Sequence, residues 1–327
     1  AGLQDVESRY RKRYVDLWAN PEAMRVFQLR SKIVAGIRRL MDARGFIEVE
    51  TPMLQAQAGG AAARPFVTHM NALDIDLSMR IAPELYLKRL LVGGMRKVYE
   101  INRNFRNEGV DKHHNPEFTM LEWYRPGLDH HALMDEVDEL LAAVSGGGVE
   151  KPRRLRFPEV FEDVVGAPPG DCEDGRLAEV AARHGVVGAM TLDRAELLDA
   201  LLATVVQPVL GDAPVHLLDF PPELAALALV RDGVAQRFEL HLGGREVANG
   251  YHELLDADEC RRRMTAENAR RRRHHRPEHV PDERLLAALA AGLPASAGVA
   301  LGVDRLLAFL EGAGALDGVI AFPADIA

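Results

Sequence analysis

The stretch Tyr99–Tyr124, YEINRNFRNEGVDKHHNPEFTMLEWY, decides the fold of this chain. Its first residues alternate between polar and apolar in the manner of a β-strand, and a second strand-like run covers residues 117–124. A polar loop that contains a glycine separates the two runs, at residues 107–115. Two such runs around a polar loop predict an antiparallel hairpin with a long tip.

Five side chains of this hairpin carry groups suited to a nucleotide. Arg106 and Glu108 lie where the first strand gives way to the loop, and His114 and Asn115 lie where the second strand begins. A guanidinium offers a phosphate a planar fork and a fixed charge. A carboxylate two residues on can hold an amino group, and Phe118 can stack on a base. We therefore expect a nucleotide site here; the alternative is a surface hairpin whose charges only form ion pairs.

The composition limits the class of protein. The 327 residues carry a net charge of −9, which argues against broad nucleic-acid binding but leaves room for a local basic patch. The two cysteines, Cys172 and Cys260, have neither a metal-binding spacing nor a disulfide framework, so we expect a cytoplasmic protein. No apolar run has the length of a membrane span, so we expect no membrane partner.

The first part of the chain predicts helices, a strand and a ligand-facing loop. A charged helix is expected over residues 4–17, and an amphipathic helix over residues 22–44 that ends at Gly45. A strand is expected over residues 46–52. The loop at residues 59–66, GGAAARPF, consists mostly of small residues, which allow a backbone to lie close to a ligand.

Two carboxylates in the second half predict a metal site. Strands are expected over residues 237–242 and 246–254, joined by a tight turn at Gly243-Gly244. This turn lets the carboxylates of Glu239 and Glu246 converge. Paired carboxylates beside a triphosphate are typical oxygen ligands for Mg²⁺. The alternative is two surface acids that face solvent.

Two other segments carry less chemistry. Residues 145–215 predict an inserted or peripheral subdomain, with helices near 176–184 and 193–206. A strongly basic helix is expected over residues 258–276, and we interpret its charges as a solvated face. The alternative is a docking patch for an acidic partner.

These segments resemble, in order, the motifs of the class II lysyl-tRNA synthetase family. FRNEG followed by HNPEFTMLEWY resembles motif 2, residues 22–52 resemble motif 1, and GVALGVDR at 298–305 resembles motif 3. The GGAAARPF loop, APELYLKRL at 82–90 and EVANGYHEL at 246–254 resemble the family as well. The resemblance implies an α+β protein with the class II aminoacyl-tRNA synthetase catalytic fold, in which helices flank a central antiparallel sheet. It also implies a homodimer built on motif 1.

The resemblance further implies a role for each candidate residue. The catalytic residues are Arg106 and Arg305, which contact the α- and γ-phosphates of ATP. The remaining ATP-binding residues are Glu108, His114, Asn115, Phe118, Glu239 and Glu246, of which the last two also hold Mg²⁺. The amino-acid pocket is formed by Glu84, Glu122, Tyr124, Asn249, Tyr251, Glu253 and Ala300.

Two subfamilies share this resemblance. Lysyl-tRNA synthetases carry an anticodon-binding domain, whereas elongation factor P–(R)-β-lysine ligases resemble the catalytic core alone. Residues 3–108 look more like a synthetase, and residues 116–144 and 234–327 look more like a ligase. Ala300 is the telling position, because synthetases usually have Gly there and the ligases have Ala. We therefore expect one catalytic domain over residues 1–327, without an anticodon-binding domain, that adenylates lysine or (R)-β-lysine and passes it to a lysine of elongation factor P.

Two alternatives remain at this stage. One is a lysyl-tRNA synthetase catalytic domain that aminoacylates tRNA(Lys). The other is a catalytically silent paralogue that binds a ligand or partner, against which several retained charged residues argue: Arg106, Glu108, Glu239, Glu246 and Arg305. Both active hypotheses require ATP and Mg²⁺.

Overall fold

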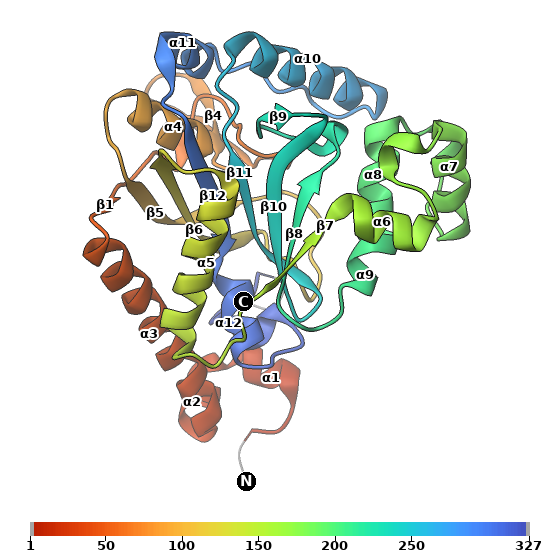
Figure 1. The fold of residues 1–327 in the computed structure, drawn as a ribbon. Coiled ribbons are helices and arrows are strands. Elements are labelled where there is room, and N and C mark those ends of the chain that lie inside the picture. Colours follow the sequence, from red (N-terminus) through yellow and green to blue (C-terminus); the bar gives the residue numbers. More distant parts are fainter. Residues whose placement is uncertain (1–2, 325–327) are drawn as a thin grey trace.

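The computed structural model describes residues 3–324, and a nine-stranded sheet forms its centre (Figure 1). The strand order is β1-β5-β6-β12-β11-β10-β8-β7, and β9 pairs with β10. The strands from β5 to β8 on this path pair antiparallel, whereas β1 and β7 at the edges pair in parallel. The predicted α+β fold is confirmed, with a mixed sheet because of its edges. The strands are β1 (Ile47–Glu48), β5 (Val98–Phe105), β6 (Glu117–Pro126), β7 (Arg153–Arg156), β8 (Val215–Phe220), β9 (Val230–Arg231), β10 (Val234–Leu242), β11 (Arg245–His252) and β12 (Ser296–Gly302).

The predicted hairpin is the pair β5 and β6. Its register runs from Val98 opposite Tyr124 to Phe105 opposite Glu117, which confirms both strands. Since side chains alternate along a strand, Trp123 points to one face of the sheet and Tyr124 to the other.

Three helices pack on the face that Trp123 joins: α3 (Pro21–Ala43), α5 (His130–Ser145) and α12 (Val303–Leu310). The prediction of an amphipathic helix over 22–44 is confirmed, and Gly45 follows it with a φ of 72°, a conformation that favours glycine. No helix within the described residues is both long and apolar enough to cross a bilayer.

The opposite face is covered by α4 (Glu84–Val92), α10 (Ala257–Arg273) and α11 (Glu283–Gly292), which Figure 1 shows at the upper side of the sheet. Leucines of α4 and α11 share one core cluster with Tyr124 and Cys260. A small three-stranded sheet precedes α4 in the sequence and consists of β2 (Leu54–Gln55), β3 (Val67–Met70) and β4 (Ile75–Met79).

A helical unit with its own core lies at one edge of the sheet, in green in Figure 1. Its helices are α6 (Phe157–Val165), α7 (Asp174–Arg183), α8 (Arg194–Leu201) and α9 (Gln207–Val209). The helices α7 and α8 agree with the two expected within residues 145–215. The strand β7, also within that range, pairs with β8 and so connects the unit to the central sheet.

The basic helix forms as α10, but most of its arginines have partners within the chain. Arg261 lies 2.6 Å from Glu283, Arg272 lies 2.8 Å from Glu278, and Arg273 pairs with Asp193. Four of these arginines, Arg261, Arg262, Arg272 and Arg273, are exposed, which agrees with the predicted solvated face. The ion pairs to neighbouring segments of the chain are an addition that the sequence did not predict, and docking of an acidic partner stays a prediction.

Two predicted boundaries are wrong. The helix expected over 4–17 is two helices, α1 (Val6–Arg11) and α2 (Arg13–Ala19), because Arg13 turns inward to pair with Asp16 at 2.6 Å and to donate to the Ala321 carbonyl. The strand expected over 46–52 is only β1. Its continuation leaves the sheet where the Thr51 hydroxyl donates to Glu100 at 2.7 Å.

One buried carboxylate ties three distant segments together. Asp304, in the first turn of α12, accepts a hydrogen bond of 2.7 Å from the backbone N–H of Thr119 in β6. It also pairs with Arg30 of α3, whose guanidinium donates to the Thr119 hydroxyl at 2.7 Å. The helix of residues 22–44, the hairpin and the C-terminal strand–helix segment are therefore fixed relative to one another.

Candidate active site

Two neighbouring rows of residues across the sheet form the floor of the candidate site. The first row has directly opposed residues on four adjacent strands: Glu122, Ala300, Asn249 and Glu239. The second row lies two residues along each strand: Tyr124, Gly298, Tyr251 and Arg237. Because residues two apart on a strand point to the same face, the register brings these predicted side chains together.

Three charged side chains meet at a buried point beside this floor. Lys88 Nζ lies 2.6 Å from Glu84 Oε1 and 2.6 Å from Glu253 Oε2. Glu84 and Lys88 share one side of α4 because they are four residues apart. Burial opposes the charge of Lys88, but the two carboxylates outweigh burial and raise its pKa.

Two carboxyl groups of this pocket, those of Glu122 and Glu253, have raised pKa values. Burial raises the pKa of Glu122 to about 8, and the charge of Glu84 adds to the rise, whereas the hydrogen bond of 2.8 Å from the Tyr124 hydroxyl opposes it. Burial also raises the pKa of Glu253 to about 7, although Lys88 acts in the opposite direction. The pocket thus combines three carboxyls with one ammonium.

Glu239 and Glu246 lie in different electrostatic surroundings. Burial opposes the ionisation of Glu239, but Arg237 and His241, whose Nε2 lies 3.1 Å from Glu239 Oε2, lower the pKa of this carboxyl. The pKa of Glu246 is raised, by burial first and by the charge of Glu239 next. Its Oε1 accepts a hydrogen bond of 3.3 Å from Asn249. The two carboxylates therefore influence each other electrostatically.

This pair fits a metal ion shared with a phosphate. Within residues 3–324, no group of three or more His, Cys, Asp or Glu side chains is arranged to hold a metal. Mg²⁺ commonly binds through one or two carboxylates and completes its shell with water and substrate phosphates. An ion between Glu239 and Glu246 would also offset the repulsion that raises the pKa of Glu246.

Arg106 has a hydrogen-bond donor without a partner among the described residues, beside the floor of the candidate site. Its guanidinium lies 5.0 Å from the ring centre of Phe118, and its Nε has no hydrogen-bond partner among the described residues. Burial lowers the pKa of Arg106, while the charges of Glu246 and Glu108 act in the opposite direction. A half-buried, incompletely paired guanidinium suits an anionic ligand.

Arg305 contacts Glu246 directly. Its Nη1 donates to the Glu246 carbonyl at 2.8 Å and lies 3.9 Å from the carboxylate. The charge of Arg305 also contributes to the lowered pKa of Arg106, so the two guanidiniums are within electrostatic reach.

Three predicted residues lie on the loop of the hairpin, away from the buried pocket. His114 is exposed, and its Nδ1 lies 2.9 Å from Asp111 Oδ2. The Asn115 side chain accepts a hydrogen bond of 3.1 Å from the backbone N–H of Ala324, and Glu108 is exposed. The structure brings Arg106 and Phe118 to the sheet and leaves these three side chains at its rim.

Comparison with known proteins identifies the family. A family model described as tRNA synthetases class II (D, K and N) matches residues 5–326. The chain belongs to the class II aminoacyl-tRNA synthetases. It is accordingly an enzyme of the ligase type that forms an aminoacyl adenylate.

Relatives of this class II synthetase match nearly its whole length. It is similar to the lysine–tRNA ligase of Histophilus somni (strain 2336), with 44% identity over 99% of this chain and 68% of the relative. It is also similar to the lysine–tRNA ligase of Carboxydothermus hydrogenoformans, with 43% identity over 98% of this chain and 70% of the relative.

The structure of this class II synthetase adds site residues that were not predicted from the sequence. Lys88 could have been found, since it lies four residues after Glu84 on a predicted helix. Arg237 could also have been found, since it precedes Glu239 by two on a strand. Gly298 had no local signal, because its need for glycine comes from the ring of Tyr124, which would lie 2.2 Å from an added Cβ.

Proposed function

We propose that this class II synthetase uses ATP to adenylate lysine and transfers the lysyl group to tRNA(Lys). The observation that carries the proposal is the charge of the buried pocket, in which Glu84, Glu122 and Glu253 face the single ammonium of Lys88. With all four groups ionised, two negative charges remain, and lysine carries two ammonium groups. Buried charges need partners, so a diamino acid suits this pocket better than a neutral one.

The shape of the pocket supports the same substrate. Tyr124 and Tyr251 supply aromatic walls, which favour a cation on an aliphatic stem. Asn249 and Ala300 lie opposite each other on the floor between Glu122 and Glu239. In this proposal the amino acid lies over these two rows, with its carboxylate directed toward Arg106.

ATP lies on the hairpin side of the amino acid. Arg106 and Arg305 contact its phosphates, and Phe118 stacks on adenine. The remaining ATP contacts come from Glu108, His114 and Asn115. Mg²⁺, held by Glu239, Glu246 and the phosphates, would neutralise phosphate charge when bound.

The chemistry follows from this placement. An oxygen of the lysine carboxylate attacks the α-phosphorus in line, the bond to pyrophosphate breaks, and lysyl adenylate and pyrophosphate form. The buried carboxyls orient lysine through its ammonium groups, while Arg106 stabilises charge on the transferring group. No side chain acts as a nucleophile. A tRNA hydroxyl then attacks the acyl carbon, and AMP leaves.

The acceptor is supported by the relatives, which are lysine–tRNA ligases. A second candidate function has one observation in its favour. The methyl of Ala300 lies on the floor between Glu122 and Asn249. The amino group of (R)-β-lysine is one carbon further from its carboxyl, so a reshaped floor favours that substrate, with elongation factor P as acceptor.

One experiment distinguishes these functions. The protein is incubated with ATP, Mg²⁺ and labelled α-lysine or (R)-β-lysine, together with tRNA(Lys) or with elongation factor P. We expect label from α-lysine on the tRNA. Label on elongation factor P would instead support the second candidate, and failure of both isomers to promote pyrophosphate exchange would overturn both.

We also propose a homodimer built on residues 22–52. Within this segment Met24 is 42% exposed and Ile47 is 51% exposed, so apolar side chains face outward from both the helix and the strand. Light scattering at micromolar concentration should show twice the mass of one chain, and a monomer would contradict the proposal. A cytoplasmic location stays a prediction from cysteine usage.

A further inference from the structure

The small-residue loop at residues 59–66 lies directly on the start of α4. A Cβ added to Gly60 would lie 3.0 Å from the Cβ of Glu84 and 3.2 Å from that of Ala82. A Cβ on Gly59 would lie 2.4 Å from Leu85 Cδ1. The backbone of this loop therefore touches the residue that holds Lys88, at the wall of the amino-acid pocket.

The loop has no regular secondary structure from Gly59 to Phe66, so its position depends on outside contacts. The Arg64 carbonyl accepts a hydrogen bond of 2.8 Å from the backbone N–H of Asn107, next to Arg106. The Ala62 carbonyl accepts a hydrogen bond from Arg271 of α10. The first contact ties the loop to the hairpin, and the second ties it to α10.

Three hydrogen bonds hold the side chain of Arg271 in a fixed position. Its side chain is 5% exposed, and its Nε donates to Glu267 at 3.2 Å while Nη1 donates to the Pro277 carbonyl at 3.3 Å. The third arm, Nη2, donates to Ala62. A planar guanidinium serves three acceptors in fixed directions, which the single ammonium of lysine does not.

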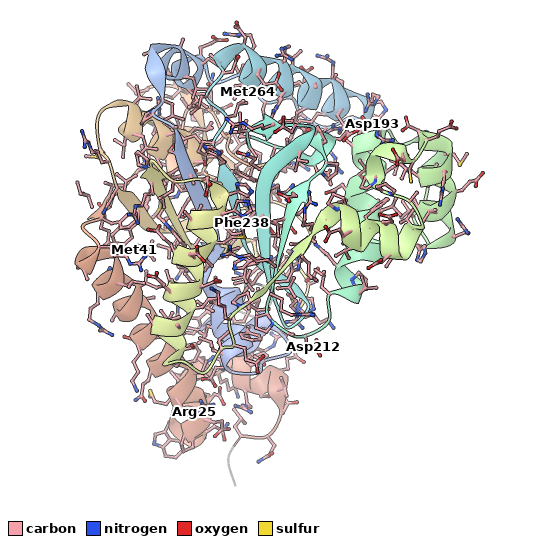
Figure 2. All side chains as sticks on the ribbon, in the orientation of Figure 1. Arg25, Met41, Asp193, Asp212, Phe238 and Met264 are labelled. Atoms are coloured by element: carbon pink, nitrogen blue, oxygen red, sulfur yellow. The ribbon has the colours of Figure 1, made fainter. Side chains whose placement is uncertain are left out.

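The helix that carries Arg271 is itself held on its far side. Arg270 Nε lies 3.5 Å from Asp193 Oδ2, and Arg273 pairs with the same carboxylate. Figure 2 labels Met264 on α10 and Asp193 where the helical unit meets the end of that helix. The loop is thus hydrogen-bonded to a helix that is itself paired with Asp193 on both sides of Arg271, through Arg270 and Arg273.

We propose that Arg271 is a positioning residue that fixes the loop 59–64 against Glu84 and thereby sets the affinity for the amino-acid substrate. The inference rests on the proposed lysine pocket. Arg271 contacts the loop at Ala62, two residues after Gly60, which lies against Glu84, whereas the contact of Arg64 with Asn107 belongs to the hairpin that carries Arg106. Loss of the Arg271 contact therefore loosens the wall of the amino-acid pocket. The hydrogen bond between the loop and the hairpin that carries Arg106 remains in place.

The test is pyrophosphate exchange, with KM for lysine and for ATP measured separately and rates normalised by active-site titration. Arg271→Met should raise KM for lysine about tenfold, the loss expected for one hydrogen bond to a charged group. KM for ATP and kcat should stay within about twofold, because the interactions with ATP are unchanged. Arg271→Lys keeps the charge and should show a smaller rise in the same direction.

The matched control is Arg272→Met, since Arg272 is 59% exposed and pairs with Glu278 rather than with the loop. It should leave both KM values unchanged. An unchanged KM for lysine in Arg271→Met would overturn the inference, and so would an equal rise in both KM values, which indicates a general distortion. If Arg271→Met does not fold, Arg271→Lys and Glu267→Gln are decided by the same criteria.

Lysine activation by the protein and the positioning role of Arg271 can be disproved separately. A wild-type protein without lysine-dependent exchange would overturn the proposed function. An active wild type whose lysine KM matches that of Arg271→Met would overturn only the positioning role.

Discussion

Lys88 and Glu253 form a buried ion pair, with 2.6 Å between Nζ and Oε2 and side chains that are 3% and 0% exposed. The same ammonium lies 2.6 Å from Glu84. Taking charges out of water costs about as much free energy as their mutual attraction returns, so such a cluster adds little net stability. The cluster instead serves binding, because it holds carboxylates at one point in the protein interior where they can pair with a cationic ligand.

Lys88→Met should destabilise the protein and remove lysine activation. Methionine keeps the length of the side chain but leaves two buried carboxyls without their cation, and one-sided loss of a buried pair costs about 3–5 kcal/mol. The loss should be larger at pH 8 than at pH 6, because protonation relieves the unpaired carboxyls. Thermal unfolding at both pH values measures the effect. Lys151→Met is the control, as Lys151 is 71% exposed, and equal melting temperatures for the two variants would contradict the prediction.

Lysine binding should release protons between pH 6 and 8. Burial raises the pKa of Glu122 to about 8 and that of Glu253 to about 7, so the free pocket holds protons that an incoming ammonium displaces. KM for lysine should fall as pH rises through this window. Calorimetry in two buffers with different ionisation enthalpies should show up to ~1 proton released per site. Glu122→Gln should release fewer protons, and a wild type whose binding heat is independent of the buffer would refute the idea.

The same shifts fix the sign of the stability effect. A carboxyl with a raised pKa keeps its proton in the folded protein at a pH where the unfolded chain has released it. The contribution of Glu122 and Glu253 to the free energy of unfolding therefore falls as pH rises from their ordinary pKa of 4.5 toward about 8. Saturating lysine should reduce this fall, because its ammonium groups pair with the ionised form.

Arg106→Ala should abolish adenylate formation while the fold survives. The side chain has an unmet donor and no ion pair of 4.0 Å or less among the described residues, so its loss removes a ligand contact rather than a structural one. Removal of one preorganised charge contact to a transition state costs ~10²–10³ in rate. Pyrophosphate exchange measures it. Arg103→Ala is the control, since Arg103 is 46% exposed on β5, three residues before Arg106, and near-normal exchange in Arg106→Ala would rule out the proposed role.

Local pattern was enough to predict the elements that carry the candidate site, though not the contacts between them. The hairpin β5–β6 follows from alternation around a polar loop, and α3 follows from apolar spacing that ends at a glycine. Lys88 could have been predicted as the partner of Glu84, since it lies four residues after Glu84 on an expected helix. An acid in the first turn of a helix, such as Glu84, is usually only a partner of the helix dipole, however. The ion pair with Glu253 depends on a segment far along the chain, so no local pattern contains it.

The arginines of α10 show the same limit. Composition predicts a basic helix, but the partners Asp193 and Glu283 come from segments whose positions are set by tertiary packing. The two rows of the floor also depend on the register of β12 between β6 and β11. Register is a property of the whole sheet, because a shift by one residue would turn Ala300 to the opposite face.

Gly298→Ala should damage the pocket, whereas Gly302→Ala on the same strand should not. A methyl at position 298 would lie 2.2 Å from the Tyr124 ring and 2.7 Å from Glu253 Oε1, and overpacking of this kind costs about 1–3 kcal/mol. At position 302 the nearest atom is 3.6 Å away, an ordinary contact. Melting temperature and KM for lysine should change only in Gly298→Ala. Equal values in the two variants would show that the rings can move aside.

Ala300→Gly tests how the floor selects the substrate. Ala300 is half-buried and lies opposite Glu122 on one side and Asn249 on the other, so its methyl occupies space beneath the amino acid. Its removal should raise the ratio of kcat/KM for α-lysine to kcat/KM for (R)-β-lysine, whichever isomer the wild type prefers, because one methyl in a packed pocket changes discrimination by roughly 10–200-fold. KM for ATP should not change, since Arg305 belongs to α12, beyond the end of the strand.

The measurement is kcat/KM for pyrophosphate exchange with both isomers, in wild type and variant. Ala297→Gly is the matched control: it removes the same methyl from the same strand, but Ala297 packs in the core on the opposite face. That variant should lower the melting temperature and leave the ratio between isomers unchanged. A wild type that already prefers α-lysine, with the same ratio in Ala300→Gly, would remove the one structural argument for elongation factor P. The tRNA(Lys) function would then stand without a competitor.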